Sequence, residues 1–164
     1  MARKEHTIFL AFDVPPTIEE NYVFGVWKLF AHSVYLTRKK LAPLKIATRH
    51  YAAMAVLASS NHSATQSTLV QVMGLSPNVV LAMVDYLDGL GYTKRVQNPR
   101  NRRENLVLLS KKGQTVYDQA AVLLREVEQE LLAPLSDEQC KQCTEIIKKL
   151  GSSAPPTRHL AIGF

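Results

Sequence analysis

Residues 87–113, LDGLGYTKRVQNPRNRRENLVLLSKKG, carry the strongest fold signal in this sequence. Two runs typical of β-strands, 91–97 and 104–110, flank the turn-rich segment Asn98-Pro99-Arg100-Asn101-Arg102-Arg103, and this pattern predicts a β-hairpin. Seven Lys and Arg side chains lie between residues 94 and 112 and only Glu104 opposes them, so this segment carries a charge of +6. Because a charged run is most often a solvated loop, the hairpin alone would favour no particular function.

The sequence before the hairpin predicts two helices joined by a short turn. The first, 66–73, is opened by a predicted capping box, Ser63-Ala64-Thr65-Gln66, and ends at Gly74. Ser76 and Pro77 then supply an N-cap and a first helical residue. A helix-turn-helix followed by a basic hairpin is the layout of a winged helix-turn-helix, in which the hairpin, or wing, contacts nucleic-acid phosphates. The second helix runs to Gly91 with apolar residues at helical spacing, namely Val80, Met83, Val84, Leu87 and Leu90.

Four further helices flank this unit. The first runs from a capping box at 17–20 to about Lys40 and is apolar on two sides, so two neighbours must cover it, and one of them could be a second subunit. The fold class is therefore mostly α with a small β-hairpin wing, in the order four helices, hairpin, two helices. The other three are predicted over 49–60 with Thr48 as the cap, from Ser110 to about Pro134, and from the capping box 136–139 to residue 150.

Composition fits one soluble domain. The chain has 164 residues, of which 46% are hydrophobic and 21% charged. Its pI of about 9.4 suits a polyanionic partner, although other basic proteins share it. The apolar stretch Ile8–Phe12 is too short for a signal peptide and no run is long enough to span a bilayer, so we expect a cytoplasmic protein without a membrane partner. No phosphate loop, metal spacing or nucleophile motif is recognisable; we expect neither an enzyme nor a cofactor.

The helix order, together with the run from Leu87 through the basic turn to Gly113, resembles the MarR (multiple antibiotic resistance regulator) family over about residues 18–150. The resemblance implies a dimeric winged-helix transcriptional regulator, here a repressor that binds a palindromic operator as a homodimer and is released by a small aromatic or phenolic effector. It also divides one integrated domain into an N-terminal arm (1–16), a helical dimerisation region (17–42 and 114–150), a DNA-binding lobe (43–113) and a C-terminal tail (151–164).

Candidate contacts to double-stranded DNA follow from the resemblance and from helix geometry. The helix from Pro77 should pack its apolar stripe inward, which leaves Asn78, Leu81, Ala82 and Asp85 on the outer side. There an Asn can pair with adenine and a Leu can touch a thymine methyl. Many family members carry Thr or Ser and then Arg on this face, where this chain has Leu81 and Ala82, and Asn101 replaces the wing-tip Asp. Capping explains Ser63, Thr65 and Asn78 equally well. The candidates are Ser63, Thr65, Gln66, Ser76, Asn78, Leu81, Ala82, Arg95, Arg100, Arg102 and Arg103, with Lys94, Lys111 and Lys112 as backbone contacts or solubility charges.

The two cysteines and the candidate effector-binding residues form no recognisable motif. Cys140 and Cys143 stand three apart in the last predicted helix, and no second Cys/His pair completes a zinc site, so buried structural thiols are predicted. The candidate effector residues are aromatic or basic and lie on the first two helices of the chain, where partly buried core residues are the simpler interpretation. They are His32, Tyr35, Arg49, His50 and Tyr51.

A second hypothesis keeps the dimeric winged helix but not its specificity. Leu81 and Ala82 cannot form bidentate hydrogen bonds to guanine. The chain could therefore be an interaction protein whose DNA binding is lost or non-specific.

Overall fold

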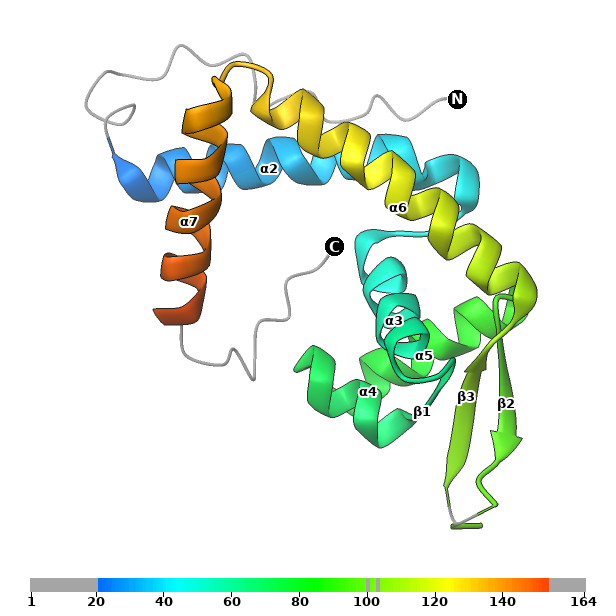
Figure 1. The fold of residues 1–164 in the computed structure, drawn as a ribbon. Coiled ribbons are helices and arrows are strands. Elements are labelled where there is room, and N and C mark those ends of the chain that lie inside the picture. Colours follow the sequence, from blue (N-terminus) through cyan, green and yellow to red (C-terminus); the bar gives the residue numbers. More distant parts are fainter. Residues whose placement is uncertain (1–20, 100, 103, 154–164) are drawn as a thin grey trace, which may run out of the picture. The chain divides into compact units, whose positions relative to one another are not determined.

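The computed structural model describes residues 21–99, 101–102 and 104–153. The chain forms two compact units, Met1–Tyr35 and Leu36–Phe164. The predicted order of helices and hairpin is confirmed, with one added strand (Figure 1). The elements are α2 (Tyr22–Leu41), the 3-10 helix η1 (Ala42–Leu44), α3 (Thr48–Ser59), β1 (Ser63–Thr65), α4 (Gln66–Met73), α5 (Pro77–Gly89), β2 (Thr93–Gln97), β3 (Asn105–Leu109), α6 (Lys111–Leu132) and α7 (Asp137–Ser153).

The sheet has three antiparallel strands in the order β1-β3-β2. Val107 of β3 lies opposite Ala64 of β1 on one side and Arg95 of β2 on the other. The strand β1 was not predicted, because a run of three residues shows no alternation of apolar and polar side chains. Positive φ angles at Asn61 and His62 turn the chain from α3 into this strand.

Two predicted helix caps are wrong in detail. Thr48 does not cap α3; the cap position is Ala47, whose amide donates to Nδ1 of His50 at 3.0 Å. Ser63 does not cap α4, because it belongs to β1, and the cap is Thr65, whose Oγ1 accepts from the Thr68 amide at 3.0 Å. For α4 the residue next to the helix takes the role through its hydroxyl, whereas for α3 the ring of His50 accepts from the amide of Ala47, whose own side chain has no acceptor. The capping box predicted at 17–20 lies outside the described residues.

The core of the larger unit lies between α3, α4, α5, α6 and the sheet. Its largest fully buried side chains include Met54, Leu57, Leu69, Leu87 and Val107. Burying one such side chain stabilises the fold by roughly 1.5–3 kcal/mol relative to leaving it in water. The apolar stripe predicted on α5 is confirmed, because Val80, Met83, Val84 and Leu87 are buried.

The wing is joined tightly to α6. Ser110 caps α6, with its Oγ accepting from the Gly113 amide at 2.9 Å and donating to the carbonyl of Gly91 at 2.7 Å. A side chain at Gly113 would bring its Cβ to 2.0 Å from the carbonyl oxygen of Tyr92. Only glycine allows this approach, so the end of α5, the wing and α6 form one continuous packed junction.

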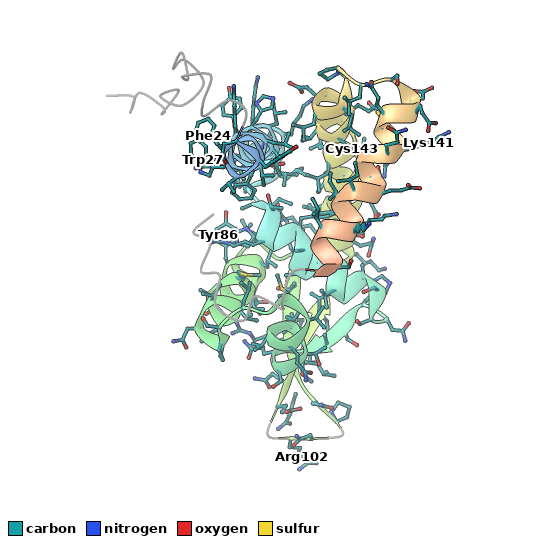
Figure 2. All side chains as sticks on the ribbon, turned by 90° about the vertical axis from the view of Figure 1, so that its left-hand side faces the viewer. Phe24, Trp27, Tyr86, Arg102, Lys141 and Cys143 are labelled. Atoms are coloured by element: carbon teal, nitrogen blue, oxygen red, sulfur yellow. The ribbon has the colours of Figure 1, made fainter. Side chains whose placement is uncertain are left out.

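The helix α7 begins at its predicted capping box and extends beyond its predicted end. The predicted capping box is confirmed, since Ser136 and Gln139 exchange hydrogen bonds at 2.9 and 3.3 Å. The helix continues to Ser153, so residues 151–153 are helical and not part of a tail. Cys140 and Cys143 are half-buried, and the prediction of buried thiols is wrong for the single chain (Figure 2 labels Cys143).

Candidate nucleic-acid interface

The helix-turn-helix formed by α4 and α5 exposes one side of α5 to solvent. Gly74, with φ of 64°, ends α4, and Ser76 and Pro77 start α5 as the sequence predicts. Because the apolar stripe of α5 is turned into the core, the residues at offsets of three, four and seven along the other side are exposed. These are Asn78, Leu81, Ala82 and Asp85. The same spacing is used by the base-reading side chains of homeodomain recognition helices.

The start of α4 is less open. Ser63, Thr65 and Gln66 are half-buried, and the Thr65 hydroxyl is engaged by the Thr68 amide and by the Thr68 hydroxyl at 2.9 Å. The hydroxyl of Thr65 is therefore used in capping α4. Ser76, at the start of α5, is exposed and its side chain makes no capping hydrogen bond, which leaves its hydroxyl available to an external acceptor.

The turn of the wing is closed by backbone hydrogen bonds. The Asn98 amide donates to the carbonyl of Glu104 at 3.0 Å, and the Glu104 amide donates to the carbonyl of Asn101 at 3.0 Å. Arg102 is exposed at the end of the hairpin (Figure 2). Arg100 and Arg103, which the sequence also predicts to contact DNA, lie outside the described residues.

Arg95 lies on β2 but has a partner inside the protein. Its guanidinium Nη2 donates to Oδ1 of Asp85, and its side chain is 27% exposed against 54% for Asp85. The ion pair ties the outer face of α5 to the strand of the wing. Arg95 is therefore a less open contact for phosphate than the neighbouring Lys94, which is exposed.

The two lysines that open α6 behave differently. Cations are unfavourable at a helix N-terminus, and the sequence predicts Lys111 and Lys112 as DNA backbone contacts or solubility charges. Lys112 instead donates to the carbonyl of Leu90 at 2.9 Å and lies 5.2 Å from the ring centroid of Tyr92. It thus satisfies a free carbonyl at the C-terminal end of α5 and gains a cation–π contact. Lys111 is exposed.

A pocket of about 430 Å³ opens beside α5. It is lined by Arg49 and His50 of α3 and by four residues of α5, Val79, Ala82, Met83 and Tyr86. Two of the five predicted effector residues are therefore brought together. Tyr86 was missed, although it shares helical spacing with Val79 and Met83, and this spacing could have identified it.

Inside the pocket wall, His50 is held as a neutral imidazole. It is 6% exposed and its ring stacks on Tyr86, with centroids 4.7 Å apart. Burial, and then the nearby charge of Arg49, lowers the pKa of His50 from 6.5 to about 4. Its Nδ1 accepts from the Ala47 amide, so the single ring proton of the neutral imidazole is on Nε2.

The other effector candidates lie elsewhere. Tyr51 stacks on Tyr117 of α6, with centroids 5.2 Å apart, and burial raises the pKa of Tyr51. It is not a lining residue of this pocket. His32 and Tyr35 belong to the other compact unit, where His32 is half-buried and Tyr35 is 53% exposed.

Within residues 21–99, 101–102 and 104–153, no group of three or more His, Cys, Asp or Glu side chains could hold a metal ion. Over the same residues, no single helix has the length and apolar character needed to cross a membrane. Taken together, α4 and α5 have the required length and composition, but the pair is bent by 117°.

Comparison with known proteins gives a clear result for the fold. No family model matches the sequence, and no curated protein matches it. Among solved structures, a probable transcriptional regulator from Pseudomonas aeruginosa has a TM-score of 0.72 at 20% identity and covers 81% of this chain and 98% of its own. The reduced form of MarR from E. coli has a TM-score of 0.71 at 23% identity, over 79% of this chain and 96% of its own.

A mutant of E. coli MarR complexed with operator DNA has a TM-score of 0.68 at 22% identity, and covers 76% of this chain and 89% of its own. These likenesses confirm the predicted fold class. The chain is a winged helix-turn-helix protein with the fold of MarR-family transcriptional regulators.

Proposed function

We propose that this protein is a non-catalytic, cytoplasmic, DNA-binding transcriptional regulator, a repressor that binds a palindromic operator as a homodimer. One observation carries the proposal: the outer face of α5 is exposed beside a basic wing in the same compact unit. The operator complex of the E. coli relative supports it by analogy of fold.

On DNA, the two parts of this surface have different tasks. Asn78 pairs with an adenine edge and Leu81 and Ala82 pack against thymine methyl groups, so α5 reads bases in the major groove. Arg102, with Arg100 and Arg103 beside it in sequence, enters the minor groove or contacts phosphates. Lys94 and Ser76 add backbone contacts. The half-buried Ser63, Thr65 and Gln66 contribute at most one phosphate contact through the amides that start α4.

The second subunit covers apolar side chains that one chain leaves in water. In α7, Ile146, Ile147 and Leu150 are 57, 57 and 65% exposed, and in α2, Val26 and Leu29 are 64 and 52% exposed. Exposed apolar side chains repeated along two helices are typical of a subunit interface. A homodimer would present two copies of α5 about one helical turn of DNA apart, which matches a palindromic operator.

The pocket beside α5 is the proposed effector site. Tyr86, Met83 and Val79 offer an apolar and aromatic wall and Arg49 offers a cation, a combination that suits a small aromatic carboxylate or phenol. Because four of its lining residues belong to α5, a bound effector would shift the helix that reads DNA and release the operator. His32, Tyr35 and Tyr51 are kept as weaker candidates outside this pocket.

Fluorescence anisotropy tests the proposal. A labelled duplex from the intergenic DNA beside the protein's gene is compared with a shuffled duplex at about 150 mM salt, where non-specific electrostatic binding is weak. We expect nanomolar affinity for the first duplex only, and dissociation on adding benzoate or salicylate as effector probes. Equal and weak binding to both duplexes would contradict specific regulation.

A second function is favoured by Leu81 and Ala82, which have no hydrogen-bonding side chain on the face that reads bases. The protein would then be a dimeric interaction protein with lost or non-specific DNA binding. In the same experiment this alternative predicts equal affinity for both duplexes, falling steeply as salt rises.

A further inference from the structure

Tyr86 links the helix that reads DNA to the segment in front of α3. Its hydroxyl donates to the carbonyl of Lys45 at 2.7 Å. Lys45 has φ of 57°, and its own amide donates to the carbonyl of Ala42 at 2.9 Å. This segment, Ala42–Ala47, leads from α2 into α3 and adopts one defined turn. The hydrogen bond therefore joins one point of α5 to this turn.

The ring of Tyr86 has a second fixed partner. It stacks on the His50 ring with an interplanar angle of 19°, and His50 is held by the Ala47 amide at 3.0 Å. Ring stacking and a directional hydrogen bond restrict both the tilt and the rotation of α5. The apolar contacts of Val80, Met83 and Val84 lack such direction, because the hydrophobic effect depends on buried area and not on orientation.

Among the described residues, two neighbouring side chains of α5 form hydrogen bonds to other elements. Asp85 accepts from Arg95 of the wing, and Tyr86 donates to the carbonyl of Lys45 in the turn before α3. Asp85 and Tyr86 are neighbours in sequence, so both links act at the same turn of α5 (Figure 2 labels Tyr86). We infer that Tyr86 is a positioning residue for DNA binding, which sets the orientation of α5 through the Lys45 carbonyl and the His50 ring. The inference rests on the proposed function, because it assigns Tyr86 a task in operator recognition.

Two hydroxyl deletions separate positioning from simple stability. Tyr86→Phe keeps the ring and removes the hydrogen bond to Lys45. Tyr92→Phe is the matched control, since the Tyr92 hydroxyl donates at 3.1 Å to the carbonyl of Leu44, the residue before Lys45, from outside α5. Tyr86→Leu also removes the stacking on His50. All are compared at a temperature where circular dichroism shows each variant to be folded.

The first readout is hydrogen–deuterium exchange of the free protein, in peptides that cover 42–51 and 77–90. We expect Tyr86→Phe to speed exchange in both peptides, Tyr86→Leu to speed it further, and Tyr92→Phe to affect 42–51 only. The second readout is anisotropy with the intergenic duplex described above. Here Tyr86→Phe should weaken binding about fivefold, the size expected for one lost hydrogen bond, and Tyr92→Phe less than twofold.

Unchanged exchange over 77–90 in Tyr86→Phe would overturn the inference whatever the DNA affinity, because a loss of affinity alone would mean that the hydroxyl touches DNA directly. Faster exchange with unchanged affinity would also overturn it, since the link would then serve stability only. If the wild type does not prefer the intergenic duplex, the proposed function fails separately. The exchange data would then still decide whether Tyr86 couples α5 to the turn.

Discussion

The winged-helix lobe and α7 treat their apolar side chains in opposite ways. Leu57, Leu69 and Leu87 of the lobe are 0% exposed, whereas Ile147 and Leu150 of α7 are 57 and 65% exposed. Both regions are well-capped helices with apolar residues at helical spacing, so the sequence pattern alone does not distinguish them. The lobe therefore completes its own core among the described residues, whereas α7 leaves apolar side chains exposed, as the proposed homodimer requires.

Removing a core side chain should break the lobe with the largest effect. Leu69→Ala is expected to lower the free energy of unfolding by about 3–4 kcal/mol, from lost burial and the cavity left behind. Urea unfolding followed by circular dichroism measures it. Val72→Ala on the same helix is the control, because Val72 is 63% exposed, and it should change stability by less than about 0.5 kcal/mol. Equal losses in the two variants would contradict the assignment of the core.

A charge on α7 should break subunit association and spare the lobe. Ile147→Glu is expected to raise the dimer dissociation constant about 100-fold, equivalent to about 3 kcal/mol, because a carboxylate replaces an apolar contact in the interface. Sedimentation equilibrium measures the constant. Gln142→Glu adds the same charge at an exposed polar position of α7 and should leave the dimer intact. A monomeric wild type, or dissociation by both variants, would contradict this interface.

The buried His50 should make the stability of the lobe depend on pH. Its pKa is lowered from 6.5 to about 4 in the folded chain, so between these values the unfolded state binds more protons. The stability that His50 contributes is therefore complete above about pH 6.5 and is lost as pH falls through 4, by about 3 kcal/mol in all. Urea unfolding of wild type and His50→Gln at several pH values measures the difference in slope. Parallel curves for the two proteins would contradict the neutral buried imidazole.

The smallest expected effect is at the wing. Arg102→Ala should weaken DNA binding about fivefold and reduce the salt dependence of the affinity by about one counterion, since one phosphate contact is lost. Anisotropy at several salt concentrations measures both quantities. Lys141→Ala, an exposed charge of α7 (Figure 2), should change neither. A large loss of DNA affinity in Lys141→Ala would contradict the assignment of the DNA-binding surface to the lobe.

Much of the lobe could be predicted because its boundaries depend on local chemistry. Gly74 accepts a positive φ, Pro77 fits a first helical turn and Ser110 caps α6. These residues act on neighbours in sequence, so a pattern along the chain is sufficient to find them. The exposed position of Asn78 and Leu81 follows in the same way from the apolar stripe of α5.

The parts that sequence could not predict depend on contacts between distant residues. Nothing local pairs Arg95 with Asp85, places Lys112 against Leu90, or joins Tyr86 to Lys45. Each of these contacts arises only when separate elements pack together, and each changes the role expected of a basic or aromatic side chain. The burial predicted for Cys140 failed for a related reason, because helical spacing identifies an apolar face of α7 but not which distant residues pack against it.

In the proposed function, two copies of α5 and its wing read DNA as a symmetric pair. Selection of duplexes from a randomised library by the purified protein, at about 150 mM salt, tests it most directly. We expect enrichment of an inverted repeat whose half-sites are centred about 10 base pairs, or a multiple of this spacing, apart. Recovered sequences indistinguishable from the starting library would contradict it.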